Sequence, residues 1–335
     1  MSTRHALFKL LADGAFHSGT ALGERLGISR AAVHKAIHAL AEVGVDIHRV
    51  SGRGYRLDEP CVPLAEASIR AQLAQRHTPV AQVRSVDAQS PAVTIEVLDE
   101  VDSTNQQLLR QTEFAGARVC LAEAQSAGRG RRGRGWVATP GHNILMSMSW
   151  RFETGPAGLS GLSLAAGLAV LHALQEFGVP DAGLKWPNDI LLDGRKLAGL
   201  LIDLRAEVNG PSWVVLGLGL NVHIAAADAA RVDQPWAALR ECLAAPVDRN
   251  RLAALLIAHL QEMFCVFAVD GFSSFHDEWQ RRHLFNGKRV QLRNGDILTV
   301  GTVEGVDANG ALRVRDAVGE IRSYHSGEVS LRAAH

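Results

Sequence analysis

The chain has 335 residues, of which 47% are hydrophobic and 21% are charged. This length exceeds one compact domain, so we expect two or three, and the composition is ordinary for a folded soluble protein. Lysine plus arginine and aspartate plus glutamate number 35 each, so any affinity for polyanions must come from local patches rather than from net charge.

The start of the chain lacks the apolar core of a signal peptide, and no apolar run reaches about 18 residues, which predicts a cytoplasmic protein with no membrane partner.

Residues 1–60 are predicted to form a winged helix-turn-helix domain. Apolar residues at helical spacing, with Ser18 and Ser29 as N-caps, indicate short helices, and residues 45–57 indicate a two-stranded hairpin. Two helices separated by a tight Gly-Ile-Ser turn and followed by a hairpin are typical of this fold.

The surface of this first domain is moderately basic. Residues 1–58 hold eight lysines and arginines against five acids. A basic helix face and wing would bind DNA, whereas the alternative is a winged helix used for protein contacts or dimerisation. The residues predicted to face DNA are Arg30, His34 and Lys35 in the second helix of the motif and Arg49, Arg53 and Arg56 in the wing.

A linker with an insertion is expected at 61–93, followed by an α/β (α+β) catalytic core with a mixed sheet at 94–284. Residues 77–92 are polar, bounded by prolines and aperiodic, which predicts a surface insertion. The core alternates predicted strands and helices. Strands are expected at 92–101, 117–125 and 143–152, helices at 103–111 and 158–178, and three further strands within 183–224.

Residues 285–335 are predicted to form a small SH3-like β-barrel. Short strands separated by turn signals fill this segment, which is too short for a sandwich.

The four cysteines, Cys61, Cys120, Cys242 and Cys265, are far apart in the sequence and have no metal-binding spacing. We expect them to be buried, reduced thiols.

Residues 126–136, SAGRGRRGRGW, contain four arginines and four glycines and no acid. Gly128, Gly130 and Gly133 form a literal G-x-G-x-x-G, but a dinucleotide site requires a helix to start there, and a strand pattern follows instead. A disordered Arg/Gly tail for nucleic acid is the second alternative, yet this segment is short and lies between predicted strands. Arginine offers forked donors to phosphate or carboxylate, and glycine lets a loop fold over a ligand, so we predict a loop that binds a small anion.

Three other stretches are unusual, although each alone has a structural explanation. Lys185 ends an apolar strand and could simply extend past Trp186 to solvent. Ser103 or Thr104 could cap the helix that follows. Glycines at 217 and 219 in an apolar strand indicate a bulge or a closely approaching ligand. No motif for a nucleophilic serine accompanies them.

Taken in order, DSTNQ, AEAQSAGRGRRGRGW, LKWPNDI, RKLAGLLID and GLGLNV resemble the biotin–protein ligases. The resemblance covers essentially the whole chain. With its winged helix in front, the chain is similar to the bacterial bifunctional type, which is also the biotin operon repressor.

This resemblance implies a two-step reaction without an enzyme-bound covalent intermediate. The biotin carboxylate attacks the α-phosphate of ATP, with Mg²⁺ expected, and gives biotinyl-5′-AMP and pyrophosphate. A lysine amine of a biotin carboxyl carrier protein then attacks the mixed anhydride. The resemblance also implies operator DNA as a partner and a homodimer that forms when biotinyl-AMP binds. Positioning and charge stabilisation suffice for this chemistry, which explains the missing nucleophile motif.

The resemblance assigns roles to particular residues and leaves any metal ligand unassigned. Those implied to contact the biotin ring system are Ser103, Thr104, Asn105 and Gln125, and those implied to close over the intermediate are Arg129, Gly130 and Arg131. The implied catalytic pair, which reaches the carboxylate and the α-phosphate, is Arg131 and Lys185. The residues implied on the nucleotide side are Asn221 and Trp236.

The chain also departs from the family pattern. Gly135 stands where bacterial relatives often have a larger basic residue, and His34 and Ala36 alter the second helix of the DNA motif, so the operator sequence is not implied. Residues 223–236 are rich in alanine, which leaves their ordering on ligand binding open. Two alternatives remain at this point: a ligase whose winged helix serves only as an interaction module, and a lipoate–protein ligase.

Overall fold

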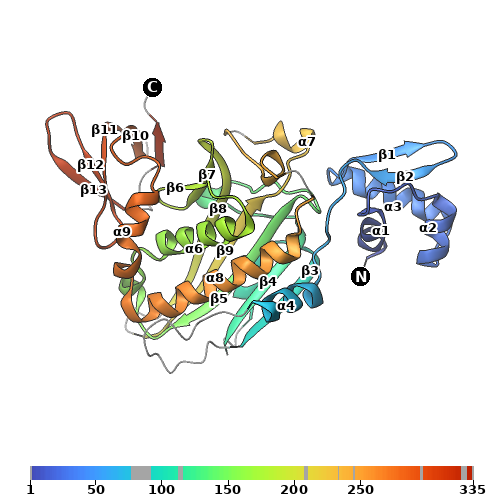
Figure 1. Ribbon diagram of the computed structural model, residues 1–335, viewed down its shortest axis with the longest axis horizontal. Coiled ribbons are helices and arrows are strands. Elements are labelled where there is room, and N and C mark those ends of the chain that lie inside the picture. The colour runs from blue at the N-terminus through green and yellow to red at the C-terminus, as the bar shows by residue number, and fades with distance from the viewer. Residues whose placement is uncertain are drawn as a thin grey trace.

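The computed structural model describes residues 2–76, 92–111, 116–206, 210–232, 234–243, 246–294, 297–325 and 330–333. A small helical domain lies at one end, a large mixed sheet with helices lies in the centre, and a second small sheet lies at the other end (Figure 1). Most of the predicted insertion at 77–92 falls outside the described residues.

The N-terminal domain is three helices and a two-stranded hairpin, as predicted. Ser18 and Ser29 are N-caps, whose hydroxyls accept from the backbone N–H of Ala21 and Ala32. Gly27 ends the second helix in the left-handed conformation, with φ of 66°. The elements are α1 (Thr3–Leu11), α2 (Gly19–Leu26), α3 (Arg30–Glu42), β1 (Ile47–Val50) and β2 (Gly54–Leu57).

The central sheet has seven strands in the order β3-β4-β5-β9-β8-β7-β6. Among the strand pairs that the structure describes in this sheet, β3 and β4 run parallel and the others antiparallel, so the predicted mixed sheet is confirmed. The expectation of three strands within 183–224 was wrong, because Lys185 and Asp189 pair across a turn and create an additional short hairpin. The strands are β3 (Val93–Val101), β4 (Ala117–Gln125), β5 (Asn143–Phe152), β6 (Gly183–Lys185), β7 (Asp189–Leu192), β8 (Arg195–Ala206) and β9 (Ser212–Asn221).

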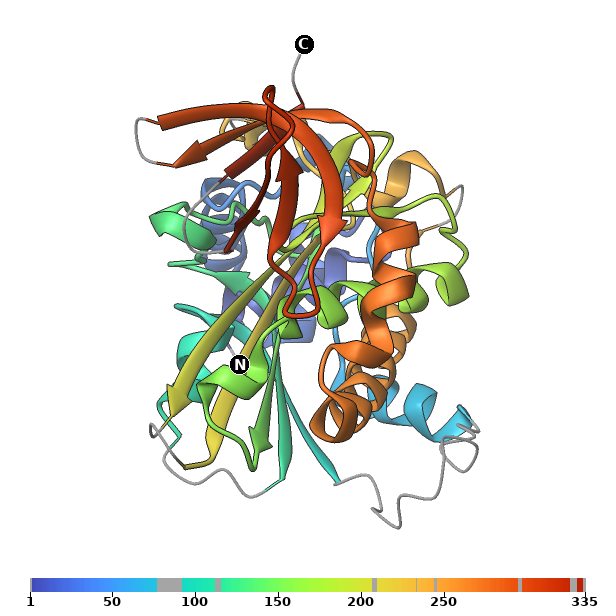
Figure 2. The same cartoon turned by 90° about the vertical axis from the view of Figure 1, so that its left-hand side faces the viewer.

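The long helices α6 (Leu162–Phe177) and α8 (Arg249–Asp270) pack against each other on one face of this sheet (Figures 1 and 2). Two segments, Pro156–Phe177 and Arg249–Asp270, are long and apolar enough to cross a membrane by composition, but 61% of the apolar window of each is buried within the protein. Both therefore act as core helices. The other helices are α4 (Glu66–Gln75), α5 (Thr104–Leu109), α7 (Ala226–Ala229) and α9 (Ser273–Arg282), with 3₁₀ turns at Arg131–Gly133, Pro156–Leu159 and Leu239–Glu241.

The C-terminal domain is a curved antiparallel sheet of five strands in the order β13-β12-β11-β10-β14 (Figure 2). It joins the central domain through Trp186, whose buried indole Nε1 donates to the carbonyl of Gly310 at 3.0 Å. The strands are β10 (Arg289–Asn294), β11 (Ile297–Val306), β12 (Leu312–Arg315), β13 (Ile321–Tyr324) and β14 (Ser330–Ala333).

The prediction of buried cysteines was only partly right. Cys120 is buried and Cys61 is half-buried, and burial raises the pKa of their thiols to about 12 and about 11. Cys242 is exposed, because it follows a short surface turn that the sequence pattern did not reveal.

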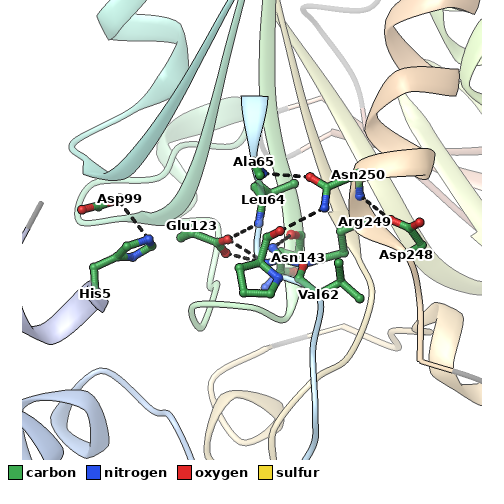
Figure 3. Close-up of polar contacts among 11 residues, drawn as sticks. His5, Val62, Leu64, Ala65, Asp99, Glu123, Asn143, Asp248, Arg249 and Asn250 are labelled. Atoms are coloured by element: carbon green, nitrogen blue, oxygen red, sulfur yellow. Dashed lines mark hydrogen bonds and ion pairs between the residues drawn. The ribbon is translucent and has the colours of Figure 1, made fainter. Parts of the chain in front are cut away.

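A buried ion pair fastens the segment after the winged helix to the central domain (Figure 3). Arg249 and Glu123 are each 1% exposed, and Arg249 Nη2 donates to both carboxylate oxygens at 2.8 and 2.7 Å. Arg249 Nε also donates to the carbonyl of Val62, and Glu123 accepts from the backbone N–H of Leu64. The chain between the two domains is therefore bound directly to the base of α8 and to β4. Beyond it, α4 packs against α8.

Candidate active site

A row of glycines on β8 and β9 lets side chains lie directly on one face of the central sheet. A Cβ at Gly219 would come within 2.5 Å of Trp136 Cε2, and one at Gly217 within 2.2 Å of Asn105 Oδ1. The pairing of β9 with its two neighbours continues through both glycines without a register shift. Of the two expectations for these glycines, a bulge is therefore excluded. The close approach is made by Trp136 and Asn105 of the same chain.

The polar side chains of the DSTNQ stretch form a buried hydrogen-bonded cluster on this face. The backbone N–H and hydroxyl of Thr104 both donate to Gln125 Oε1, at 2.7 and 3.0 Å. The hydroxyl of Ser147 lies 2.7 Å from Thr104 Oγ1 and 2.5 Å from Asn105 Oδ1. Ser147 has a single proton for these two acceptors. The cluster therefore has acceptor capacity to spare for a donor from a ligand.

Helix capping does not explain Ser103 or Thr104. Ser103 occupies the N-cap position of α5, with extended φ and ψ of −158° and 132°, but its side chain makes no capping hydrogen bond. Thr104 is directed to Gln125 instead. The capping interpretation was wrong because the partner of Thr104 lies on the neighbouring strand, 21 residues away.

The arginine–glycine loop is a compact hairpin. Arg129 and Gly135 form a β-bridge, and the backbone N–H of Gly130 donates to the carbonyl of Arg134 at 2.7 Å. At the tip, Arg132 and Gly133 both have positive φ, of 57° and 72°. Residues 126–142 contain no α-helix, so the dinucleotide interpretation of the glycines is excluded.

Two of the four arginines of the loop, Arg129 and Arg131, contact the sheet and the Trp-Pro-Asn-Asp turn, while Arg132 and Arg134 are exposed. Arg129 Nη2 donates to Asp203 Oδ2 on β8 at 3.2 Å. Arg131 Nη1 donates to Asn188 Oδ1 at 3.0 Å, and burial, with the nearby charge of Arg132, lowers the pKa of Arg131. The loop and this turn, far apart in sequence, are thus in direct contact.

Lys185 lies at the same place, beside a second lysine. Its Nζ is 3.9 Å from Asp189 Oδ2, while Lys196 Nζ is 2.8 Å from Asp189 Oδ1. Lys196 also lies over the ring of Trp136, 5.5 Å from the ring centroid. Trp186 is 1% exposed, whereas the side chain of Lys185 is 22% exposed, so Lys185 lies partly buried beside Asp189. The structure places Lys185 beside the turn that holds Arg131.

Asn221 and Trp236 lie on the other side of Lys196. Asn221 Nδ2 donates to the carbonyls of Lys196 and Ala237, at 3.3 and 3.1 Å. Trp236 pairs with Lys196 as an isolated parallel bridge and is half-buried. Asn221 thus holds the segment that carries Trp236 against β8.

In the winged helix, Arg30 and Lys35 are exposed on α3. His34 is half-buried and lies 3.3 Å from Arg49 Nη1 on the wing. The guanidinium of Arg53 stacks over Phe16, 4.3 Å from the ring centroid, with Arg56 at 5.3 Å. His34 and Arg49 therefore meet where α3 faces the wing, whereas Arg53 and Arg56 lie against Phe16.

Sequence reasoning missed several residues of the site, namely Ser147, Asp189, Lys196 and Asp203. Asp189, Lys196 and Asp203 lie within the stretches LKWPNDI and RKLAGLLID, but no chemical pattern assigned them a role, and Ser147 lies inside a predicted strand. The alternation of β8 was the available signal, because it places Asp203 on the same face as Gly199, where Trp136 packs. Within the described part of the chain, no three His, Cys, Asp or Glu side chains are grouped as metal ligands.

Three family models match the chain. The Biotin/lipoate A/B protein ligase family covers residues 96–221, an HTH domain covers 3–56, and the Biotin protein ligase C terminal domain covers 285–332.

Individual relatives extend this match to nearly the full length. The bifunctional ligase/repressor BirA of Escherichia coli (strain K12) is 40% identical over 98% of this chain and 97% of its own. The biotin–[acetyl-CoA-carboxylase] ligase of Mycobacterium tuberculosis (strain ATCC 25618 / H37Rv) is 38% identical over 75% of this chain and 89% of its own. The biotin protein ligase from Aquifex aeolicus, solved in complex with biotin and ATP, superposes with a TM-score of 0.61 at 27% identity, over 72% of this chain and 99% of that one. The chain belongs to the biotin–protein ligase family.

Proposed function

We propose that the protein activates biotin with ATP to biotinyl-5′-AMP and transfers biotin to a lysine of a biotin carboxyl carrier protein. The observation that carries this proposal is the contact of Arg131 with Asn188, which joins the cationic loop to the turn that follows Lys185. The polar cluster of Thr104, Asn105 and Gln125 is connected to the same loop, because Asp203 accepts from both Asn105 and Arg129.

The polar cluster suits the ring system of biotin. The ureido group of biotin has N–H donors, and the cluster offers more acceptors than its own protons satisfy. Ser103 lies at the same helix start, where its side chain makes no capping bond and is 4% exposed. The indole of Trp136 forms an apolar wall, with the sheet beneath it made smooth by Gly199 and Gly219. A bicyclic ligand with a polar edge and an apolar body fits such surroundings.

The cations would allow two anions to meet. In the first step, a carboxylate oxygen of biotin attacks the α-phosphorus of ATP, a P–O bond forms, and the bond to pyrophosphate breaks. Arg129, Arg131 and Lys185 lower the repulsion and stabilise the charge that builds on the phosphate oxygens. Gly130 permits the hairpin to bend over the intermediate. In the second step the amine of the carrier lysine attacks the acyl carbon and AMP leaves, with no nucleophile from the protein.

The nucleotide would lie toward Trp236, whose ring packs on adenine, with Asn221 fixing the segment that carries it. We treat Mg²⁺ as part of the MgATP substrate and assign it no protein ligand.

Biotin-dependent exchange of pyrophosphate into ATP tests the first step. We expect pyrophosphate exchange that depends on biotin and none that depends on lipoate. Lipoate added as a competitor should leave the exchange rate with biotin unchanged. Absence of biotin-dependent exchange would refute the proposal, and lipoate-dependent exchange would favour the lipoate ligase alternative.

Arg131→Ala tests the assignment of the loop. Because one charge-stabilising donor contributes about 10²–10³ in rate, exchange should slow by that factor and biotinyl-AMP should dissociate faster. Retention of the intermediate at the rate of the unchanged protein would show that the loop does not close over it.

We further propose that the protein represses biotin synthesis as a homodimer that forms on binding biotinyl-AMP. The exposed Arg30 and Lys35, together with His34 and Arg53, support an operator-binding surface on α3 and the wing. Gel shifts with the DNA upstream of the biotin genes should show binding that increases with biotin plus ATP. If the DNA is ignored in both conditions, the winged helix is an interaction module.

The domain division that accompanies this proposal is 1–60 for DNA binding, 61–93 as a linker, 94–284 for catalysis and 285–335 as the C-terminal domain. We also propose a cytoplasmic location, because biotin, ATP, the carrier protein and DNA are all present in that compartment.

A further inference from the structure

We propose that Asp203 is a positioning residue for the first step of the reaction. It would orient the amide of Asn105 and hold Arg129 at the edge of the biotin pocket before a ligand arrives. The inference rests on the proposed function, because it takes Asn105 and Arg129 as groups that bind biotin and the intermediate.

A single oxygen of Asp203 joins the two parts of the site. Asp203 Oδ2 accepts from Asn105 Nδ2 at 2.9 Å and from Arg129 Nη2 at 3.2 Å. Asn105 belongs to the polar cluster and is 4% exposed, whereas Arg129 is in the cationic loop and its side chain is 45% exposed. The carboxylate thus lies at the border between the pocket and the loop.

The carboxylate of Asp203, together with the carbonyl of Leu201 at 3.4 Å, determines which way the amide of Asn105 faces. An ionised carboxylate only accepts hydrogen bonds, so the NH₂ group of Asn105 must be turned toward Asp203. The carbonyl oxygen of the amide then faces Ser147, 2.5 Å away, and the row of glycines at Gly217. A flipped amide would set two acceptors against each other at Asp203. Asp203 therefore keeps an acceptor, rather than a donor, of Asn105 turned toward Ser147 and the polar cluster.

The same carboxylate holds the loop loosely. Asp203 is 28% exposed and Arg129 is 45% exposed, so solvent screens their ion pair. A phosphate or carboxylate from the ligand would compete effectively for the guanidinium. Arg129 would then leave Asp203 for the ligand, while Asn105 would keep its bond to Asp203. Such an arrangement prepares the free site for binding and has little influence once the intermediate has formed.

A residue that prepares the free site for binding affects the KM for biotin more than it affects kcat. In Asp203→Asn the charge is lost, the amide of residue 203 can face Asn105 in either direction, and Arg129 is no longer held. We expect the KM for biotin in pyrophosphate exchange to rise about tenfold, a loss of about 1.4 kcal/mol in binding, with kcat within about threefold. A purely structural role would instead lower the amount of folded enzyme and leave the KM of the remainder unchanged.

A double variant tests the link to the loop. If Asp203 acts partly through Arg129, the effect of Asp203→Asn on the KM for biotin should be smaller in an Arg129→Gln background than in the unchanged protein. Glu304→Gln is the matched control, because it removes a carboxylate paired with Arg315 in the C-terminal domain. Its kinetics should equal those of the unchanged protein.

The result that would overturn the inference is an unchanged KM for biotin in Asp203→Asn, a fall in kcat alone, or additive effects of the two substitutions. Each of these is distinguishable from failure of the proposed function, which would show as a lack of biotin-dependent exchange in the unchanged protein. Thermal melting of each variant confirms that folded protein is being compared.

Discussion

Removing the guanidinium of Arg249 should destabilise the central domain far more than removing any surface arginine. In Arg249→Met, the side chain keeps its length but loses its charge and four hydrogen bonds, to Val62, Asn143 and both oxygens of Glu123. Glu123 would remain 1% exposed, and among the described residues the N–H of Leu64 would be its one remaining hydrogen-bond donor. A buried charge left without its partner costs about 3–5 kcal/mol, a large fraction of the stability of a typical domain.

Urea denaturation followed by intrinsic tryptophan fluorescence, to which the buried Trp150 and Trp186 of the central core contribute, measures this loss of stability. Glu123→Gln in the Arg249→Met background removes the stranded charge, so the double variant should be more stable than the sum of the single effects predicts, by about 2 kcal/mol. Arg70→Met is the control, because Arg70 and Glu66 form an exposed pair worth about 0.3–0.5 kcal/mol.

The reasoning is refuted if Arg249→Met costs less than about 1 kcal/mol, or if the double variant shows no coupling. The first result would mean that Glu123 escapes to water or takes up a proton without cost. The second would mean that the guanidinium acts only as a packing group.

Further outcomes follow from the glycine row and from two buried histidines. Gly219→Ala would bring a Cβ within 2.5 Å of Trp136 Cε2, so we expect the free energy of unfolding to fall by about 1–3 kcal/mol and calorimetry to show weaker biotin binding. The Cβ of the control variant Gly135→Ala would meet nothing closer than 4.0 Å, so this variant should bind biotin as the unchanged protein does. Burial, helped by the charges of His223 and Arg249, lowers the pKa of His142 to about 3, and burial lowers the pKa of His283 to about 4. Because both pKa values lie below the unfolded value of about 6.5, these histidines favour the folded state fully only above that pH. Between pH 7 and pH 5, each histidine should lower the free energy of unfolding measured in urea titrations by about 2 kcal/mol. His142→Gln should remove about half of this slope, and an unchanged slope would show that His142 titrates normally.

Local sequence signals predicted the fold well where one element carries the whole signal. Serine caps and glycine stops placed the helices of the winged domain, because a cap and its N–H partner are only three residues apart. The hairpin formed by β6 and β7 was missed as a separate pair, because β6 has three residues and so shows no alternation. A strand that short is created by pairing with its neighbour, which the sequence does not display.

The site shows the same limit at a larger scale. Trp136 and Asn105 explain the glycines at 217 and 219, but nothing near those glycines in sequence indicates which side chains cover them. Thr104 was interpreted as a helix cap, since its true partner, Gln125, lies on another strand. Family resemblance supplied roles for such residues, while Asp203 and Lys196 were found only when the sheet brought them beside the loop.

The burial of each charge matches what the charge must do. Arg249 and Glu123, each 1% exposed, hold the segment after the winged helix against the central domain. Separating the pair would leave a buried charge without a partner. In the proposed site, Arg129 and Asp203 pair while their side chains are 45% and 28% exposed, so water screens this pair and a ligand anion can replace the acid at small cost. A site built from fully buried pairs would bind its own acids more tightly than any substrate. Partial exposure of the loop is therefore a requirement of the adenylation that we propose, because the cations must change partners in every cycle.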